Sequence, residues 1–388
     1  MIETNNTYTK LTLWKTYYLS CISIFLSLLS CDANRKTTSQ NYDLQLVFSD
    51  SITIEVPDTI PDINHANSWF YKDNKISYLI NIDELTIYEY DFITKYWNKI
   101  CISRLQDYII EYHGPFGYIN DSTIIYSHSY KSELLLIDLI NKKVIKKYDL
   151  PEDCKIVQTN NLDYFVDTTI LIVQSMYDGW INESYIEVAK LSIEVNRESG
   201  DIVSIAPYPE EYQIDERTTI KQILPDMVLF KDSIVMSFKT EPLLYIYNRK
   251  DSTFRLAQCK DQNIKSHTGY SFTGNVFKDA ILEEFTGLYK EFIYDNKSKL
   301  YYRISLGYPN FSGEIPRSRE EINKITSTRQ FTVSVLDSNL NMISQNTLEG
   351  VSEINHFSKD GKLYLRTATS NESEINFIGF KLIKKAQL

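Results

Sequence analysis

The amino-acid sequence predicts an all-β fold, and within that class a β-propeller with six blades. The chain has 388 residues, including 29 Tyr and 18 Phe together with abundant Ile and Leu, and these residue types favour strands. It has only 12 Gly, so its turns must be built mainly from Asn, Asp, Ser and Lys. Short turn motifs built on Asp recur along the chain at a spacing typical of propeller blades.

The first recurring motif is an Asp followed by small or polar residues and then by an Ile or Leu that opens a strand. Asp and Asn side chains bond to their own backbone, so this pattern favours a tight turn between two strands. The copies are 48, 46, 65, 47 and 81 residues apart, so three intervals share a period and two require insertions. The motif occurs at Asp73, Asp121, Asp167, Asp232, Asp279 and Asp360.

A second polar turn usually follows the first after 16–18 residues, at Asp91, Asp138, Asn248 and Asp295. Each copy ends one strand and leads to another. Two turns per repeat give three to four strands, and repeats of this length with four strands are typical of propeller blades. A single blade cannot bury both of its faces, so we expect the blades to pack on one another in a ring.

We expect residues 44–56 to form an early strand pair that completes the last blade near residues 377–383, which closes the ring and removes exposed edges. An additional hairpin at residues 331–337 leaves seven blades possible, and a pair of β-sandwiches is the alternative architecture. Helix is expected to be sparse, with one short helix within residues 314–326. This stretch and residues 207–224 are interpreted as insertions over one face.

The N-terminus is typical of a bacterial lipoprotein signal. Lys10 and Lys15 precede an apolar run, residues 17–29, that is too short to span a bilayer as a helix. Ser30 then places a small residue before Cys31, as in a lipobox. This pattern predicts cleavage before Cys31 and attachment of lipid to its thiol. The alternative is an ordinary signal or short anchor with a chance cysteine.

The predicted organisation has three parts. Residues 1–30 form a lipoprotein signal peptide, residues 31–41 a polar, flexible tether, and residues 42–388 a single β-propeller domain. The predicted location is the cell envelope, with the protein lipid-anchored to a membrane on the periplasmic side or the outward-facing side of the outer membrane.

Composition limits the partners. The net charge is −10 and no basic stripe is present, which argues against nucleic acid and against an electrostatic grip on anionic lipid. Three cysteines remain beyond the signal and Cys31, so at most one disulfide can form, and burial in the core is the favoured interpretation. These are Cys101, Cys154 and Cys259.

No catalytic motif is present. The sequence lacks a serine-hydrolase elbow, a phosphate-binding glycine loop, zinc-ligand spacing and a calcium loop. We therefore predict no catalytic residue, no metal ligand and no cofactor, and we favour a protein that is not an enzyme. A propeller can still gather metal ligands from distant blades around its axis, which residue spacing does not reveal.

Three residues are candidates for ligand binding, each with a structural alternative. His113, in His113-Gly-Pro-Phe-Gly117, could touch a ligand at a face of the ring, or this segment could be a rigid turn between blades. Trp180 could stack on a sugar, or pack in the core or rim. Arg303 could meet an anionic ligand, or pair with a neighbouring carboxylate.

The lipobox, the tyrosine-rich blades, the segment from His113 into Tyr118-Ile-Asn-Asp121, and Tyr301-Tyr-Arg-Ile304 together resemble the domain of unknown function 4221 family. Its members are bacterial lipoproteins of about this length. The chain also resembles lipoproteins described as six-bladed propellers. The resemblance covers most of residues 31–388 and implies location and fold, but it brings no reaction.

These observations favour a membrane-anchored envelope lipoprotein that is a non-enzymatic binding or scaffold module for a protein, peptide or glycan. The alternative is a propeller enzyme with a central metal, of the lactonase or lyase type. A third hypothesis is a structural or sensory part of an envelope complex.

Overall fold

The computed structural model describes most of the chain from Tyr42 onward. The described residues are 42–63, 66, 68–72, 74–81, 84–106, 108–110, 114–128, 132–157, 162–177, 185–210, 212, 223–261, 264, 285, 287–309, 316, 318–367 and 373–385. Met1–Asp43 and Leu44–Leu388 form separate units. The predicted signal peptide, Cys31 and the tether of residues 31–41 therefore lie outside the described residues.

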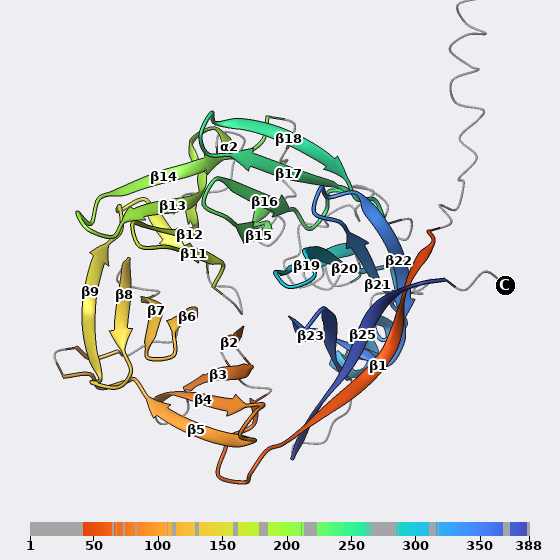
Figure 1. The fold of residues 1–388 in the computed structure, drawn as a ribbon, viewed down its shortest axis with the longest axis horizontal. Coiled ribbons are helices and arrows are strands. Elements are labelled where there is room, and N and C mark those ends of the chain that lie inside the picture. Colours follow the sequence, from red (N-terminus) through yellow and green to blue (C-terminus); the bar gives the residue numbers. More distant parts are fainter. Residues whose placement is uncertain are drawn as a thin grey trace, which may run out of the picture. The chain divides into compact units, whose positions relative to one another are not determined.

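The unit Leu44–Leu388 is a ring of six antiparallel sheets, which confirms the predicted six-bladed propeller (Figure 1). Blade 1 contains β2 (Ser68–Lys72), β3 (Lys75–Asn81), β4 (Leu85–Asp91) and β5 (Tyr96–Cys101). Blade 2 contains β6 (Phe116–Asn120), β7 (Thr123–His128), β8 (Glu133–Asp138) and β9 (Lys143–Asp149). Blade 3 contains β10 (Cys154–Ile156), β11 (Tyr164–Val166), β12 (Ile170–Tyr177), β13 (Lys190–Asn196) and β14 (Ile202–Pro207), with β10 and β11 both paired to β12.

The remaining blades follow in chain order. Blade 4 contains β15 (Asp226–Leu229), β16 (Ser233–Ser237), β17 (Leu243–Asn248) and β18 (Thr253–Gln258). Blade 5 contains β19 (Leu288–Asp295), β20 (Leu300–Leu306), β21 (Phe331–Leu336) and β22 (Met342–Leu348). Blade 6 contains β23 (Val351–Lys359), β24 (Lys362–Thr367), β25 (Glu374–Lys384) and the N-terminal strand β1 (Leu44–Glu55).

The pairing of β1 with β25 closes the ring. The two strands are antiparallel, with Leu44 opposite Lys384 and Glu55 opposite Glu374. β1 is one strand of 12 residues with an irregularity between Phe48 and Asp50, so the expected strand pair at residues 44–56 was wrong although its place in the last blade is confirmed. The first strand of the ring thus supplies the outer edge of its last blade.

β1 also bonds to the blades on either side. The Trp97 indole N–H, from β5, donates to the Glu55 carbonyl at 2.8 Å. On the other side, Leu46 N–H donates to the side-chain oxygen of Asn346 at 2.9 Å, and the Ser344 hydroxyl donates to the carbonyl of Leu44 at 2.8 Å. Closure therefore involves three consecutive blades.

Buried apolar side chains confirm that the blades depend on one another. Among the described residues they form six clusters, and each cluster draws its members from two neighbouring blades. The cluster at the closure contains Ile54 from β1, Phe377 from β25 and Trp69 from β2. The hydrophobic stabilisation of each blade thus lies mainly at its contacts with the next.

The recurring Asp residues build turns as the sequence predicts. The Asp91 carboxylate accepts the Ile93 N–H at 2.7 Å, and Asp167 accepts the Thr169 N–H at 2.8 Å. Residues other than Gly adopt the left-handed backbone that such turns require. Those with positive φ in turns between strands include Asn74, Lys95, Lys142, Ser252, Lys299 and Asp360.

In blade 5 the assignment of turns from the sequence was wrong. Asp295 was interpreted as the second turn after Asp279, but it lies in the first turn of the blade, between β19 and β20. The second turn is at Asp337, so residues 331–336 form the ordinary third strand β21, and the predicted additional hairpin at residues 331–337 was wrong. Asp279 and Asp73 lie outside the described residues.

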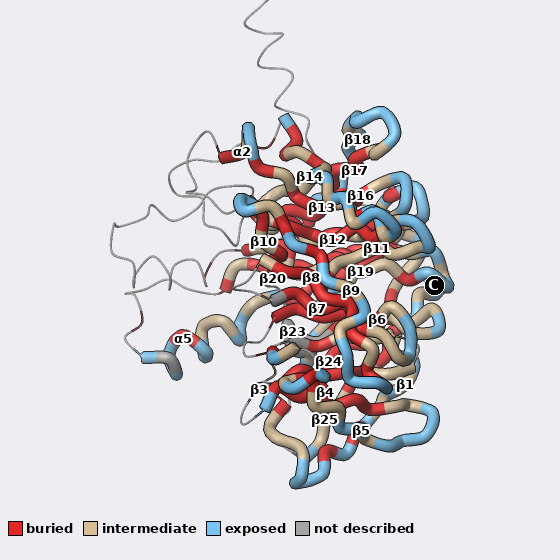
Figure 2. Tube along the Cα trace, turned by 90° about the vertical axis from the view of Figure 1, so that its left-hand side faces the viewer, coloured by how far each residue is buried: buried red, intermediate tan, exposed pale blue. Residues whose placement is uncertain are grey.

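The ring has two different faces. The tight-turn face carries the short turns that join the first strand to the second in every blade and the third strand to the fourth in blades 1 to 5. The loop face carries the other connections, including α2 (Tyr185–Val188) and α5 (Arg319–Thr326), as Figure 2 shows. The predicted helix within residues 314–326 is thus confirmed, and both predicted insertions leave from this one face. Because β1 and β25 are antiparallel, Leu44 and Lys384 both lie at the tight-turn face.

Among the residues that the structure describes, no helix has the length and hydropathy needed to cross a membrane.

Replacing Ile54 with Ala tests the closure. Ile54 is fully buried, so we expect the free energy of unfolding to fall by about 2–4 kcal/mol in urea denaturation. Phe48→Ala is the matched control in the same strand, because Phe48 is 65% exposed and its loss should change stability by less than about 0.5 kcal/mol. Equal effects of the two substitutions would contradict the observed packing of β1.

Candidate functional site at the ring axis

The innermost strands of a propeller surround its axis, so side chains from different blades meet there. β15 packs beside β11 and β19, and β19 packs beside β23. Several ionisable residues lie on or next to these strands, and four of them approach the axis from different blades. Asp163 precedes β11, Asp226 opens β15, Glu291 lies in β19 and His356 lies in β23. We call these four residues the axial cluster.

One of its carboxylates, that of Asp163, joins blades 3 and 4, and the Asp226 carboxylate lies beside it. One oxygen of Asp163 accepts the Met227 N–H at 3.2 Å, while the Asp163 carbonyl accepts the Gln174 N–H at 3.0 Å. The Gln174 side chain in turn donates to the Pro225 carbonyl at 2.6 Å. Oδ2 of Asp226 is buried and has no hydrogen-bond partner in the described structure. The cluster therefore contains an unused acceptor.

Burial sets the protonation of both carboxylates. Burial raises the pKa of Asp163 to about 7, and the charges of Asp226 and Glu291 act in the same direction. Burial also raises the pKa of Asp226 to about 7, with a further rise from Glu291 and opposing effects from Lys239 and Lys290. Near neutral pH each of these groups can therefore either accept or donate a hydrogen bond.

The other two members form a pair between blades 5 and 6. Nδ1 of His356 lies 2.7 Å from Oε2 of Glu291, and the His356 side chain is fully buried. Both residues follow a break in strand register, after Tyr289 in β19 and after Val351 in β23. Such irregularities redirect side chains, here toward each other.

The axial cluster can bind donor groups and exchange protons. Its carboxylates suit ammonium, amide N–H or hydroxyl groups. Within the described ranges, no group of three or more His, Cys, Asp or Glu residues is arranged to hold a metal ion. Because Asp163 and Asp226 precede or open inner strands that run toward the tight-turn face, they lie at the end of the axis nearer the loop face.

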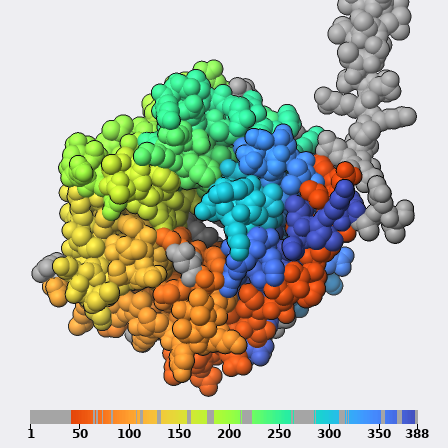
Figure 3. Space-filling model, in the orientation of Figure 1, coloured from red at the N-terminus to blue at the C-terminus, as the bar shows by residue number. Residues whose placement is uncertain are grey.

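A small polar pocket lies between blades 1 and 2, near the tight-turn face. Its lining includes Lys75, whose ammonium lies 3.1 Å from Glu89. The Lys72 ammonium donates to the carbonyls of Tyr118 and Ile119 at 2.7 and 2.9 Å. The two Lys72 bonds connect blade 1 to blade 2, whereas the ion pair of Lys75 with Glu89 lies within blade 1. Figure 3 views the ring from the tight-turn face and shows it hollowed at its middle.

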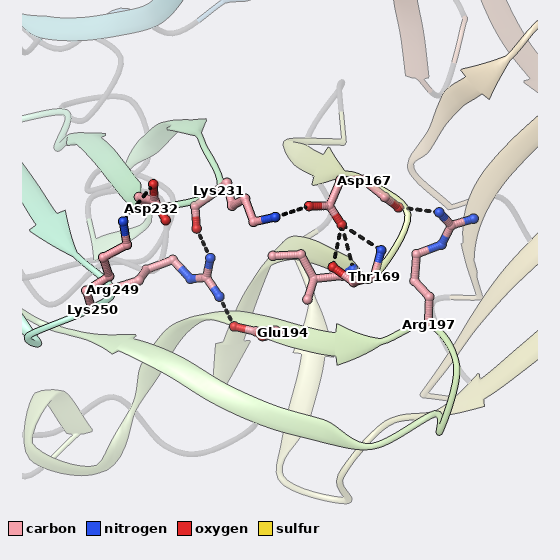
Figure 4. Close-up of polar contacts among 9 residues, drawn as sticks. Asp167, Thr169, Glu194, Arg197, Lys231, Asp232, Arg249 and Lys250 are labelled. Carbon is pink, nitrogen blue, oxygen red and sulfur yellow. Dashed lines mark hydrogen bonds and ion pairs between the residues drawn. The ribbon is translucent and has the colours of Figure 1, made fainter.

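Blades 3 and 4 are joined at the tight-turn face by a row of polar contacts (Figure 4). Lys231 forms an ion pair with Asp167 at 2.9 Å, while Arg249 bonds both to Glu194 and to the carbonyl of Lys231. Arg197 donates to the Asp167 carbonyl. The hydrogen bond from Lys231 holds the pKa of Asp167 below its usual range. These contacts hold the tight turns of blades 3 and 4 against each other.

Arg303 has a structural role in the blade 4–blade 5 contact. Its guanidinium is fully buried and lies 3.4 Å over the ring of Tyr289. All five of its N–H groups have protein acceptors, a requirement for a buried guanidinium. These acceptors are the Ser237 hydroxyl and the carbonyls of Phe238, Glu241, Pro242 and Cys259. No N–H remains for the predicted anionic ligand.

The other predicted ligand-binding residues, His113 and Trp180, lie outside the described residues, and their roles stay predictions. The cysteines Cys101, Cys154 and Cys259 are all free, so no disulfide joins them. Cys154 and Cys259 are buried as expected, and burial raises the pKa of Cys154 to about 11.

Sequence reasoning missed the axial cluster, although a signal was present. Asp163, Glu291 and His356 each stand four residues before an Asp of a first turn, and Asp226 stands six before Asp232. In blade 2 the residue four before Asp121 is Gly117. Aligning the repeats on their first turns would therefore have shown ionisable residues gathered in the inner strands of blades 3 to 6.

We predict that Asp226→Asn stabilises the protein in a pH-dependent way. The pKa of Asp226 is about 7 in the folded state against an ordinary value of 3.8, so stability falls as pH rises from about 4 to 7. Asn cannot ionise, and should raise the free energy of unfolding by roughly 1–3 kcal/mol at pH 8 but little at pH 4. Asp167→Asn should show the opposite sign, because the lowered pKa of Asp167 stabilises the fold above pH 4. Thermal unfolding across pH measures both, and a gain from Asp226→Asn that is independent of pH would contradict this account.

Comparison with known proteins supports the fold assignment. A family model described as a domain of unknown function, DUF4221, matches residues 43–345. No match was found among curated proteins. A solved DUF4221 family member from Bacteroides vulgatus has a TM-score of 0.69 and 16% sequence identity, over 89% of this chain and 100% of that chain.

Two further solved structures are similar at lower scores. A protein from Bacteroides fragilis has a TM-score of 0.48 and 11% identity, over 92% of this chain and 98% of that chain. BamB from Moraxella catarrhalis has a TM-score of 0.37 and 10% identity, over 82% of this chain and 70% of that chain. The family match, which spans more than three quarters of the sequence, and the six-bladed ring lead to one conclusion: the chain belongs to the DUF4221 family.

Proposed function

We propose that this protein is a cell-envelope lipoprotein, anchored by acyl chains on Cys31, whose propeller binds a protein, peptide or glycan without catalysing a reaction. The anchor is supported by the charged start, the short apolar run and the Ser30-Cys31 junction. Twelve residues separate Cys31 from the first strand of the ring. Several acyl chains on one cysteine suffice for stable membrane attachment.

The observation that carries the binding role is the unused oxygen of Asp226 in the axial cluster. A buried acceptor without a donor costs about 1–3 kcal/mol, and a ligand N–H or O–H placed there would recover that cost. Asp163 beside it supplies a second carboxylate that can accept or donate near neutral pH. Proteins, peptides and glycans all carry suitable donor groups.

A propeller enzyme with a central metal is the second candidate, favoured by the position of carboxylates and a histidine on inner strands around the axis. Elemental analysis of the purified protein separates the two. A divalent metal bound at one equivalent and lost in Asp226→Asn would support the enzyme, and would count against the purely binding role.

Replacing Cys31 with Ala tests the anchor. We expect the variant to lose incorporation of labelled palmitate and to leave the membrane fraction, because no other residue offers a lipobox thiol. Cys21→Ala is the matched control, since Cys21 lies within the predicted signal and should leave labelling intact. Undiminished labelling of Cys31→Ala would contradict the proposed site.

The binding role is tested with detergent-solubilised protein on a glycan array and in pull-downs from envelope extract. We expect at least a tenfold loss of captured ligand with Asp226→Asn, because an amide replaces a group that can be a carboxylate. Exposed Asp251→Asn, in a turn of blade 4, serves as the control. Capture that is equal for wild type and Asp226→Asn would exclude the axial cluster as the binding site.

A further inference from the structure

Two apolar side chains project from the tight-turn face. Ile93 is 74% exposed and Ile140 is 77% exposed. They occupy equivalent places, two residues after the Asp that opens the second turn of blades 1 and 2. Asp91 and Asp138 accept their backbone N–H groups at 2.7 and 2.9 Å, which fixes both turns. Each isoleucine therefore stands at the tip of a rigid turn.

The same place in other blades is polar. Blades 3, 4 and 5 carry Glu198, Lys250 and Asn339 there. Blade 6 has no such turn, because its fourth strand is β1 from the N-terminus. Exposed apolar tips at this position are therefore confined to two neighbouring blades among those that the structure describes.

Further exposed side chains near these tips suit a lipid headgroup layer. Tyr96 is 77% exposed and follows the turn that carries Ile93. Lys95, Lys142 and Lys143 are exposed beside the two tips. Aliphatic side chains with tyrosine and lysine around them are typical of surfaces that lie in the membrane interface. This local lysine group stands in a chain whose net charge is −10.

The chain enters the ring from this same face. Leu44 pairs with Lys384 at the tight-turn end of blade 6, and blade 6 adjoins blade 1 through the cluster that contains Ile54 and Trp69. Thirteen residue steps connect Cys31 to Leu44, a reach of at most about 45 Å when fully extended. A lipid on Cys31 therefore keeps the tight-turn face, where the chain enters the ring, close to the bilayer.

We propose that the tight-turn face of blades 1 and 2 rests on the membrane surface, with Ile93 and Ile140 inserted at the boundary of headgroups and acyl chains. The proposal rests on the lipid anchor proposed above. This orientation turns the loop face, and the end of the axis that carries Asp163 and Asp226, away from the membrane. Ligands would then reach the axial cluster from the aqueous side.

The test uses full-length lipidated protein reconstituted in vesicles of phosphatidylcholine and phosphatidylglycerol. A polarity-sensitive thiol fluorophore is placed by Ile93→Cys or Ile140→Cys in a Cys101→Ser background. The control positions are Lys250→Cys, in the equivalent turn of blade 4, and Glu152→Cys, which is exposed on the loop face. Flotation of the vesicles reports the anchor independently.

We expect a blue shift of fluorescence at positions 93 and 140 on reconstitution, quenching there by lipids with a quencher near the headgroup, and neither change at position 152. A smaller blue shift at position 250 than at position 93 is expected if the ring is tilted and touches the membrane through blades 1 and 2. If the protein floats with the vesicles but positions 93 and 140 show no shift, the surface contact is overturned and the anchor stands. If the protein does not float, the anchor fails and the proposal fails with it.

Discussion

The pairing of β1 with β25 is the constraint on which the rest of this structure depends. Each of the six apolar clusters lies between two blades, so no blade is complete until its neighbours are in place. Closure supplies the last of these contacts and also removes the free edge of β25. The bond from Trp97 to the Glu55 carbonyl then links the closing strand to blade 1. Contacts distant in sequence thus hold together strands that are joined by short local turns.

The ring separates two kinds of surface. Its tight-turn face is fixed by side chains that bond to turns, as in the contact of Lys231 with Asp167, and it is where the chain enters. Its loop face carries the long connections, and the end of the axis with Asp163 and Asp226 lies at this face. The axial carboxylates Asp163 and Asp226 cost stability above neutral pH, in contrast with the fully satisfied Arg303. Carboxylates whose burial lowers the stability of the fold in this way are typical of binding or catalytic sites.

Local chemistry made much of the fold predictable. Asp at tight turns, few glycines and aromatic strands were sufficient to predict six blades. The early strand region at residues 44–56 predicted closure, and the pattern that follows Pro316 predicted the helix near residue 320. Blade 5 was misread because Asp295 follows a Tyr-rich strand as the second turns of other blades do. The role of Arg303 was not predictable, because its acceptors are mostly backbone carbonyls of blade 4, which leave no sequence pattern. The axial cluster was missed because its members are about 65 residues apart and meet only when the ring closes.

Native-state hydrogen exchange of β1 tests ring closure most directly. If β1 is part of the cooperative ring, the amides that β1 donates to β25 exchange only through global unfolding, with the same protection as amides in the central strand β24. Residue pairs such as Thr53 with Asn376 and Ile54 with Ile375 define the region to observe. Protection of β1 equal to that of β24 is the result this account predicts. Exchange of the β1 amides within seconds, while β24 stays protected, would contradict it.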